Sequence, residues 1–199
     1  NEIGTIQPIK KLAHLAHEYG ALFHTDAAQA VMDGLVNVKE SGVDLMSLSS
    51  HKMHGPKGIG ILYISHDIQE SVAPLIYGGG QQNGLRAGTL PTHLCVGMGA
   101  AARFIQENQQ MIQEGILSMR KLFWNLLQKR VSGARIIGPN FDCRHSGNLN
   151  VCFKGVDAHI LLGILQLDIG ASSGSACTSG TVEPSHVLSA IGLPYNDAE

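Results

Sequence analysis

Residues 43–52, VDLMSLSSHK, indicate how the chain folds and where its chemistry lies. The mainly apolar run from Val43 to Leu48 predicts a buried strand, and two serines, a histidine and Lys52 follow it at once. A lysine that is desolvated at a strand end becomes a nucleophile that condenses with carbonyl groups. We therefore interpret Lys52 as a Schiff-base lysine. The alternative is a lysine that lies beside a glycine turn and extends into solvent.

Composition restricts the class of protein. The chain has 199 residues, of which 44% are hydrophobic and 15% charged, so it can bury a substantial core without long disordered tracts. A net charge of −2 gives no electrostatic case for binding nucleic acid or an anionic membrane. No apolar stretch reaches the ~20 residues that span a bilayer. The cysteines form no CxxC pair, which argues against a zinc site or a secreted disulfide scaffold. We expect a soluble protein of a reducing compartment.

Helices and strands alternate along the first half of the chain. The apolar spacing predicts these elements in order: a helix over 9–19 that Gly20 ends, a strand over 21–24, a short helix over 27–32, and strands over 44–48 and 58–64. Strands of this type belong to sheets that are covered on both faces and that bind ligands at their strand ends. Asp26 and Lys52 both occupy such positions.

The second half predicts a helical region followed by a second unit. Two helices are expected between 94 and 131, with a break near residues 107–108. The unit that starts near 132 is expected to contain strands over 134–137, 148–153 and 168–170, a helix over 158–166, and a helix that opens at 183–185.

The residue types around Lys52 suit pyridoxal phosphate (PLP), which needs an imine-forming amine and a cup for its phosphate. Three candidate phosphate donors precede the lysine: Ser49, Ser50 and His51. Asp26 can pair with a protonated pyridine nitrogen, and Gln29, three residues further on, can hydrogen-bond the phenolic oxygen of the ring. For Asp26, the alternative is an aspartate that forms a turn or caps a helix.

Cys177 carries the most specific chemistry among the other polar positions, and the remaining ones are weaker candidates. Cys177 follows serines and glycines in residues 172–177, SSGSAC, and a thiol on such a loop can travel to a bound substrate. A cysteine that lies in the loop by chance is the alternative. Arg86 and Thr89, after a glycine-rich stretch, are anion contacts if a phosphate lies near them. His14 and His17 share a helix face, but no third ligand is identifiable, so no metal site is predicted.

Taken together, these blocks resemble the cysteine desulfurases of the NifS/IscS type, which are PLP-dependent members of the class V aminotransferase family. The resemblance covers essentially the whole chain and rests on residues 1–4 (NEIG), 24–29 (HTDAAQ), 49–52 (SSHK), 55–58 (GPKG), 86–91 (RAGTLP) and 172–177 (SSGSAC). It implies the α/β fold of the aspartate aminotransferase-like enzymes. Residues 1–108 would form part of a large mixed-sheet domain, and residues 109–199 most of a small α+β domain.

The resemblance also implies a role for each matching residue. Lys52 would hold PLP and later move protons at the substrate's Cα. Cys177 would attack the sulfur of PLP-bound L-cysteine, which leaves an enzyme persulfide and releases L-alanine. Asn1 would approach the substrate carboxylate. The other positions would hold the cofactor: Asp26 at the pyridine nitrogen, Gln29 at the ring oxygen, Ser49 and His51 at the phosphate, and Thr89 at the phosphate of the partner subunit.

The implied protein is a homodimer that passes sulfur to acceptors such as an iron–sulfur cluster scaffold, in the cytoplasm or, in a eukaryote, in the mitochondrial matrix. Family members are longer than this chain, so we expect a segment that lacks the upstream phosphate loop, the histidine that stacks on the ring and the downstream arginine that binds the substrate carboxylate. The segment alone would be weakly active or inactive. Two other functions stay open: a related PLP aminotransferase or selenocysteine lyase, and a non-catalytic scaffold for sulfur transfer.

Overall fold

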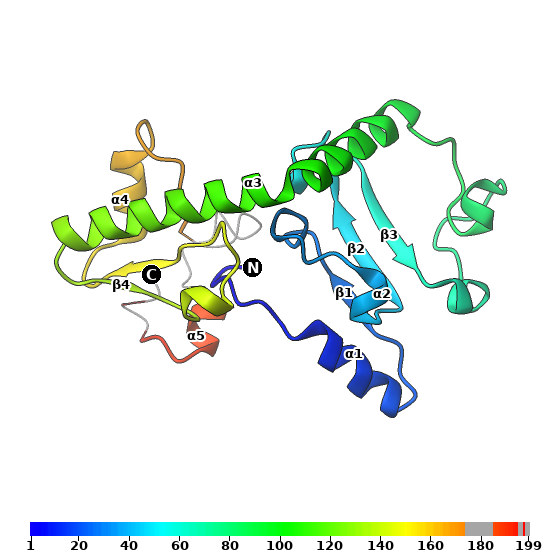
Figure 1. The fold of residues 1–199 in the computed structure, drawn as a ribbon, viewed down its shortest axis with the longest axis horizontal. Coiled ribbons are helices and arrows are strands. Elements are labelled where there is room, and N and C mark those ends of the chain that lie inside the picture. The colour runs from blue at the N-terminus through cyan, green and yellow to red at the C-terminus, as the bar shows by residue number, and fades with distance from the viewer. Residues whose placement is uncertain (174–184, 195–196, 198–199) are drawn as a thin grey trace. The chain divides into compact units, whose positions relative to one another are not determined.

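The computed structural model describes residues 1–173, 185–194 and 197, and the chain divides into two compact units (Figure 1). The N-terminal unit comprises residues 7–113, and the C-terminal unit comprises residues 1–6 together with those from 114 onward. The dividing point lies within the long helix α3 (Thr92–Arg130). The assignment of residues 1–108 and 109–199 to a large and a small domain stays a prediction.

The N-terminal unit is built on a sheet of three strands in the order β1, β2, β3 (Figure 1). The strands are β1 (His24–Asp26), β2 (Leu45–Ser49) and β3 (Gly60–Ile64). β1 pairs with β2 in parallel and β3 pairs with β2 antiparallel, so the sheet is mixed, as the fold class predicted. Cover on both faces was also expected, but Ile61 and Leu62 of β3 are about half exposed, at 48% and 51%.

Two clusters of apolar side chains form the core of this unit. Helix α1 (Ile9–Glu18) contributes Ala13, which packs with Ala27, Val43 and Met46. Gly20, at φ +68°, follows the end of α1, in the left-handed conformation that glycine adopts without strain. The second cluster joins the turn after β2 to α3, and its buried members are Met53, Met98 and Ile105. The short α2 (Val38–Ser41) begins at Asn37, whose side chain accepts hydrogen bonds from the next turn.

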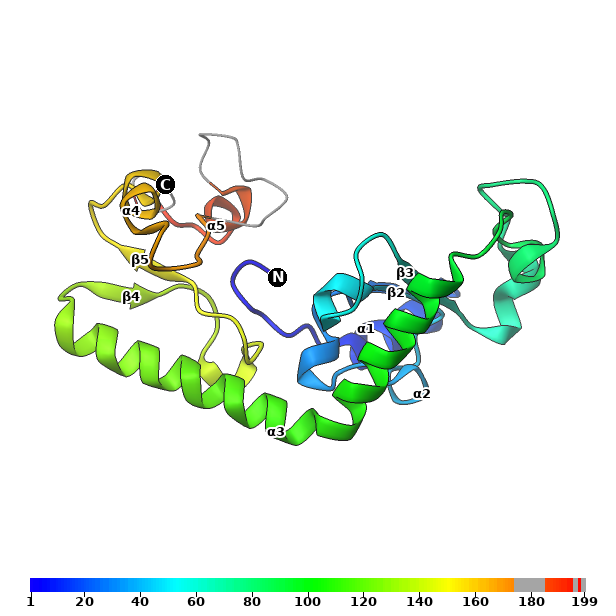
Figure 2. The same cartoon turned by 90° about the horizontal axis from the view of Figure 1, so that it is seen from above.

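The two helices predicted with a break near residues 107–108 form one continuous helix, α3, of 39 residues, whose ribbon bends along its length but is not interrupted (Figure 2). Both residues supply a backbone N–H, and neither is a proline or glycine. The side-chain amide of Asn108 donates to the carbonyl oxygen of Phe104 at 2.8 Å, one turn earlier. Asn108 is therefore accommodated by hydrogen bonding within the helix and does not interrupt it.

The C-terminal unit has a two-stranded antiparallel sheet of β4 (Ala134–Ile136) and β5 (Val151–Phe153). Helix α4 (Ala158–Leu165) is capped by Asp157, and α5 (His186–Ala190) by Ser185. The core of the unit contains Ile137, Cys152 and Leu188. Short 3₁₀ turns complete the described chain: η1 (Val31–Asp33), η2 (Ser50–Met53), η3 (His66–Ser71), η4 (Gln81–Gly84) and η5 (Phe141–Cys143).

The strand predicted over 168–170 is absent from the structure. The N–H groups of Asp168 and Ile169 both donate to the carbonyl oxygen of Leu165, at 2.9 Å each. These amides therefore close the end of α4 and do not pair with a strand. Within the described ranges, no helix is both long and apolar enough to cross a membrane.

Candidate functional site

The carboxyl ends of β1 and β2 meet at one edge of the sheet in the N-terminal unit. Asp26, the last residue of β1, is the register partner of Ser47 in β2. The N–H of Ala27 continues this pairing by donating to the carbonyl oxygen of Ser47 at 2.9 Å. Because the two strands are parallel, Asp26 and the turn that carries Lys52 leave the sheet at the same edge.

Asp26 is exposed and begins a tight turn. Its Oδ1 accepts a hydrogen bond of 2.9 Å from the N–H of Ala28, which is an Asx turn. The helix predicted over 27–32 is therefore replaced by this turn and by η1, because the first backbone donors are taken by the sheet and by the carboxylate. Gln29 lies half-buried in the same turn. One carboxylate oxygen of Asp26, Oδ1, therefore forms the turn, as the alternative interpretation proposed. The other oxygen, Oδ2, remains available to contact a ligand.

Lys52 lies in η2, between two residues that anchor this turn in the protein. Residues three apart in a 3₁₀ helix share a face, and here the shared inner face consists of Ser50, at 0% exposure, and Met53, at 2%. His51 is exposed and Lys52 is half-buried. The lysine thus stands on the accessible side of a turn whose other side is fixed in the core.

Ser49 and His51 are paired at the start of this turn, with Ser49 Oγ 2.9 Å from His51 Nδ1. A hydroxyl and an imidazole side by side at a chain turn can both donate to an anion. Ser50 cannot, although the sequence predicted three phosphate donors here. Its side chain is fully buried, so the interpretation of Ser50 as a phosphate donor was wrong.

The remaining predicted site residues do not belong to these two strand ends. Thr89 is exposed on the loop between η4 and α3, where the Arg86 guanidinium donates to the carbonyl oxygen of Ala87 at 2.7 Å. Asn1 is exposed and belongs to the C-terminal unit. Cys177 lies outside the described residues. The structure therefore brings together the candidates on the two strand ends, and the placement of Thr89, Asn1 and Cys177 in a site stays a prediction.

One polar pair at this edge was not predicted as functional. His24 Nε2 lies 2.7 Å from Ser47 Oγ, so Ser47 is linked to His24 by its side chain and to the Asp26 turn by its backbone. His24 and Asp26 are two residues apart on β1 and share one face of the strand. Polar residues at every second position along 24–26 and 47–49 were the sequence signal that could have identified the polar side chains on this face of the sheet.

At the opposite end of β2, Asp44 makes structural contacts. Asp44 Oδ2 accepts a hydrogen bond of 2.7 Å from the N–H of Phe23 and lies 2.8 Å from His17 Nε2. Burial raises the pKa of the Asp44 carboxyl, but the Phe23 N–H and His17 outweigh burial, and the net pKa is below its ordinary value. Among the described residues, no group of three histidine, cysteine or acidic side chains could hold a metal ion.

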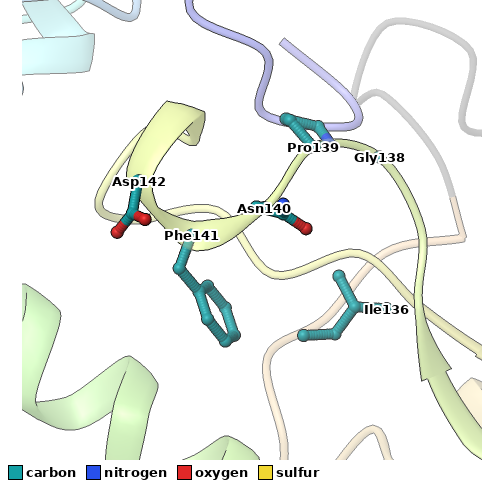
Figure 3. A pocket seen from close by; sticks show the side chains of 6 residues that line it. All are labelled: Ile136, Gly138, Pro139, Asn140, Phe141 and Asp142. Atoms are coloured by element: carbon teal, nitrogen blue, oxygen red, sulfur yellow. The ribbon is translucent and has the colours of Figure 1, made fainter.

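The C-terminal unit has a pocket of a different character (Figure 3). Its lining comprises Ile136, Gly138, Pro139, Asn140, Phe141 and Asp142. The Phe141 ring is stacked by Arg120, whose guanidinium carbon lies 4.8 Å from the ring centroid. None of the predicted site residues that the structure describes lines this pocket, and the one charged residue in the described lining, Asp142, is exposed.

The side chains at the sheet edge fit pyridoxal phosphate. A carboxylate suits the cationic pyridine nitrogen, a primary amine suits the aldehyde, and a hydroxyl paired with an imidazole suits the phosphate. Asp26, Lys52, Ser49 and His51 supply these groups from two neighbouring strand ends.

Comparison with known proteins agrees with this geometry. Residues 1–193 match the family described as Aminotransferase class-V. The chain is 42% identical over 194 residues to cysteine desulfurase IscS of Ehrlichia chaffeensis, and 42% identical over 193 residues to that of Rickettsia prowazekii. Each alignment covers 97% of this chain and 47% of the relative, so the chain spans about half the length of the curated relatives it matches.

Solved structures give the same result for the fold. A NifS-like protein from Rickettsia africae superposes with a TM-score of 0.86 at 27% identity, over 99% of this chain and 51% of that protein. The structure of SspA in complex with cysteine superposes with a TM-score of 0.76 at 36% identity, over 99% of this chain and 53% of SspA.

Proposed function

The chain belongs to the aminotransferase class-V family and has its α/β fold, and we propose that the protein is a PLP-dependent cysteine desulfurase. It converts L-cysteine to L-alanine and transfers the sulfur to Cys177. The observation that carries the proposal is the parallel pairing of β1 and β2, which brings Asp26 and the Lys52 turn to one edge of the sheet. The names of the relatives support it, because the proteins that align with 97% of this chain are named cysteine desulfurases.

When bound, pyridoxal phosphate supplies an electron sink that stabilises negative charge at the Cα of an amino acid. Lys52 holds the cofactor through its Nζ and later moves a proton at the substrate's Cα. Support for this role comes from the position of the lysine in η2, half-buried on a turn that Ser50 and Met53 anchor.

The ring of the cofactor is oriented by the β1 end of the site. Asp26 accepts a hydrogen bond from the pyridine nitrogen and keeps it protonated, and Gln29 donates to the ring oxygen. The hydrogen bond from Ala28 supports this role, because it fixes one carboxylate oxygen of Asp26 at the strand end. A fixed carboxylate stabilises the cationic nitrogen without reorganisation during the reaction.

The phosphate is held by Ser49 and His51, and their 2.9 Å contact supports the assignment because it presents both groups together. Thr89 contacts the phosphate that is bound by the partner subunit, which makes the active protein a homodimer. An exposed position on the loop before α3 is compatible with contact to a second copy. Asn1 binds the substrate carboxylate.

Sulfur transfer uses Cys177 as a thiolate. Its Sγ attacks the sulfur of the bound L-cysteine, the Cβ–S bond of the substrate breaks, and the electron pair of that bond stays with the Cβ side of the substrate. Protonation of Cβ and release from the site then give L-alanine, and the sulfur stays on Cys177 as a persulfide. An acceptor protein, such as an iron–sulfur cluster scaffold, removes this sulfur. We place the reaction in the cytoplasm.

Mapping of the cofactor to one lysine tests the proposal. The purified protein is incubated with pyridoxal phosphate, the visible absorbance of the adduct is recorded, and the adduct is reduced with borohydride and located by mass spectrometry. Modification is expected at Lys52 alone and is lost in Lys52→Ala. Lys57→Ala is the matched control, because Lys57 is an exposed lysine on the same loop. Equal labelling of both lysines, or an unchanged visible band in Lys52→Ala, would show that the protein has no specific PLP site.

A further inference from the structure

We infer that Gly55 is a positioning residue for Lys52, because the absence of a side chain at residue 55 leaves the space that the Ser50 side chain occupies. Ser50 and Lys52 belong to the same 3₁₀ turn, η2, which we call the lysine turn. The inference rests on the proposed function, since it concerns how Lys52 is held for the cofactor. It adds Gly55 and Ser50 to the residues on which the site depends, although neither contacts the cofactor.

Ser50 ties the lysine turn to the loop that follows it. Its side chain is fully buried, at 0% exposure. Its N–H donates to the carbonyl oxygen of Ile59 at 3.2 Å, and its carbonyl oxygen accepts from the N–H of Gly55 at 3.0 Å. Because Lys52 lies two residues further along the same short 3₁₀ turn, a displacement of Ser50 also displaces the lysine.

The space at residue 55 is too small for any side chain. A Cβ atom there would lie 2.3 Å from Ser50 Oγ, 3.2 Å from the Ser50 carbonyl oxygen and 3.3 Å from Ala101 Cβ. The φ angle of Gly55 is outside the left-handed region, so its backbone conformation does not require glycine. The neighbouring His54, at φ 61°, adopts the left-handed conformation instead. Glycine is thus needed at position 55 for space.

Helix α3 closes the opposite side of this loop. A Cβ atom on Gly97 would lie 3.0 Å from Cγ and 3.1 Å from Cδ of Pro56. Met53, at the end of the lysine turn, packs against Met98 in the same helix. The loop therefore cannot move toward α3 to make room for a larger residue 55, and the displaced group is Ser50.

The contact between the two residues is one of packing. Ser50 Oγ has no hydrogen-bond partner among the residues that the structure describes. Loss of this oxygen therefore removes the closest clash without breaking a described hydrogen bond. Ser50→Ala should consequently rescue a variant in which residue 55 carries a methyl group, which is a specific prediction of the packing argument.

The test uses the PLP-loaded protein and three variants: Gly55→Ala, the double variant Ser50→Ala/Gly55→Ala, and Gly99→Ala. Gly99 is the matched control, since it is a glycine of α3 with no atom within 4 Å of an added Cβ. Gly55→Ala is expected to weaken PLP binding about tenfold, the effect of overpacking at a filled site, and to shift the pH titration of the visible adduct. The double variant should regain most of this loss, and Gly99→Ala should behave as the wild type.

Thermal unfolding of the apoproteins separates this inference from a general loss of stability. A folded Gly55→Ala that binds PLP with wild-type affinity and titration, or a folded double variant that regains nothing, would overturn the inference. If Gly55→Ala does not fold, Gly97→Ala applies a milder push on Pro56 from the other side, and wild-type PLP binding by it would likewise contradict the inference. Failure of the proposed function looks different, because wild type and Gly99→Ala would then also lack the adduct at Lys52. Recovery of the unfolding midpoint in the double variant would still decide whether the contact exists.

Discussion

Asp26 and Ser47 are register partners in the parallel pair of β1 and β2, and the Ser47 carbonyl oxygen accepts the N–H of the residue after Asp26 at 2.9 Å. The Asp26 turn is thus hydrogen-bonded to Ser47 of β2. Ser49, two residues further along, is where the lysine turn begins. Backbone hydrogen bonds therefore set the spacing between the two halves of the candidate site. Side chains can be exchanged at this edge without loss of the arrangement, which makes the following variants informative.

Asp26→Asn should separate cofactor binding from catalysis. Asparagine keeps a side-chain oxygen for the N–H of Ala28, so the turn and the unfolding midpoint should be retained. An amide cannot hold the pyridine nitrogen protonated, and L-alanine formation should fall about 100-fold, as for loss of one preorganised electrostatic group. Borohydride trapping at Lys52 and an L-alanine assay measure the two properties. Wild-type turnover in the folded variant would remove Asp26 from the site.

Ser49→Ala should weaken cofactor binding. The substitution deletes the hydroxyl that lies 2.9 Å from His51 Nδ1, and with it one donor to the phosphate. The dissociation constant of PLP should rise about tenfold, the effect of losing one hydrogen bond to a charged group. A titration of the visible adduct measures this change, and Ser71→Ala, at an exposed serine of η3, is the control. An equal dissociation constant in both variants would argue against a phosphate contact by Ser49.

Acid should lower the free energy of unfolding of the N-terminal unit, because Asp44 becomes protonated. Its carboxyl has a folded-state pKa below the ordinary value, because the Phe23 N–H and His17 outweigh the effect of burial. The stability that this shift contributes is present above about pH 4 and is lost as the pH falls through the lower, folded-state pKa. Asp44→Asn should lose about 1 kcal/mol near neutral pH and little at acidic pH. Urea unfolding between pH 6 and pH 3 tests this, and parallel acid profiles for the two proteins would contradict it.

Arg144→Lys should destabilise the C-terminal unit. Arg144 is 3% exposed, and its guanidinium donates to the carbonyl oxygens of Ile137, at 2.6 Å, and Pro139, and to Asn148 Oδ1 at 2.7 Å. Its burial lowers the pKa of the guanidinium, with Arg120 adding a smaller effect. A lysine cannot reach these acceptors from one plane, and the free energy of unfolding should fall by about 2–4 kcal/mol.

The matched control for this variant is Arg130→Lys, at an exposed arginine in the last turn of α3. Thermal unfolding compares the two variants with the wild type. A loss of similar size in both would mean that the buried hydrogen bonds of Arg144 contribute nothing specific.

The sequence predicted the positions of the strands approximately because that signal is local. Apolar runs bounded by turn residues locate β2 and β3, whereas β1, expected over 21–24, forms over His24–Asp26 with Asp26 as its last residue. The mixed direction of the sheet came from the family resemblance. No short-range pattern contains it, since the pairing of β3 against β2 depends on the loop between them.

The errors arose where hydrogen bonding or packing decides the outcome. Asn108 resembled a helix break, but its side chain bonds within α3. Residues 168–170 resembled a strand, but the amides of Asp168 and Ile169 close α4. Ser50 resembled its neighbours Ser49 and His51, and only the direction of the 3₁₀ turn against Gly55 shows that it points inward. The roles of all the candidate site residues, Asn1, Thr89 and Cys177 among them, remain predictions.

The central claim is most directly tested by following both products of L-cysteine in PLP-loaded protein extended to the full length of its relatives, because the segment alone is expected to be weakly active or inactive. L-Alanine is quantified, and the persulfide is located by mass spectrometry, in the wild type, in Cys177→Ser and in Cys95→Ser. Cys95 is the control because it is an exposed free cysteine on α3. We predict that L-alanine and a persulfide on Cys177 form together in the wild type and in Cys95→Ser, and that neither forms in Cys177→Ser. Undiminished sulfur release in Cys177→Ser, or sulfur release by the wild type without L-alanine, would contradict a cysteine desulfurase.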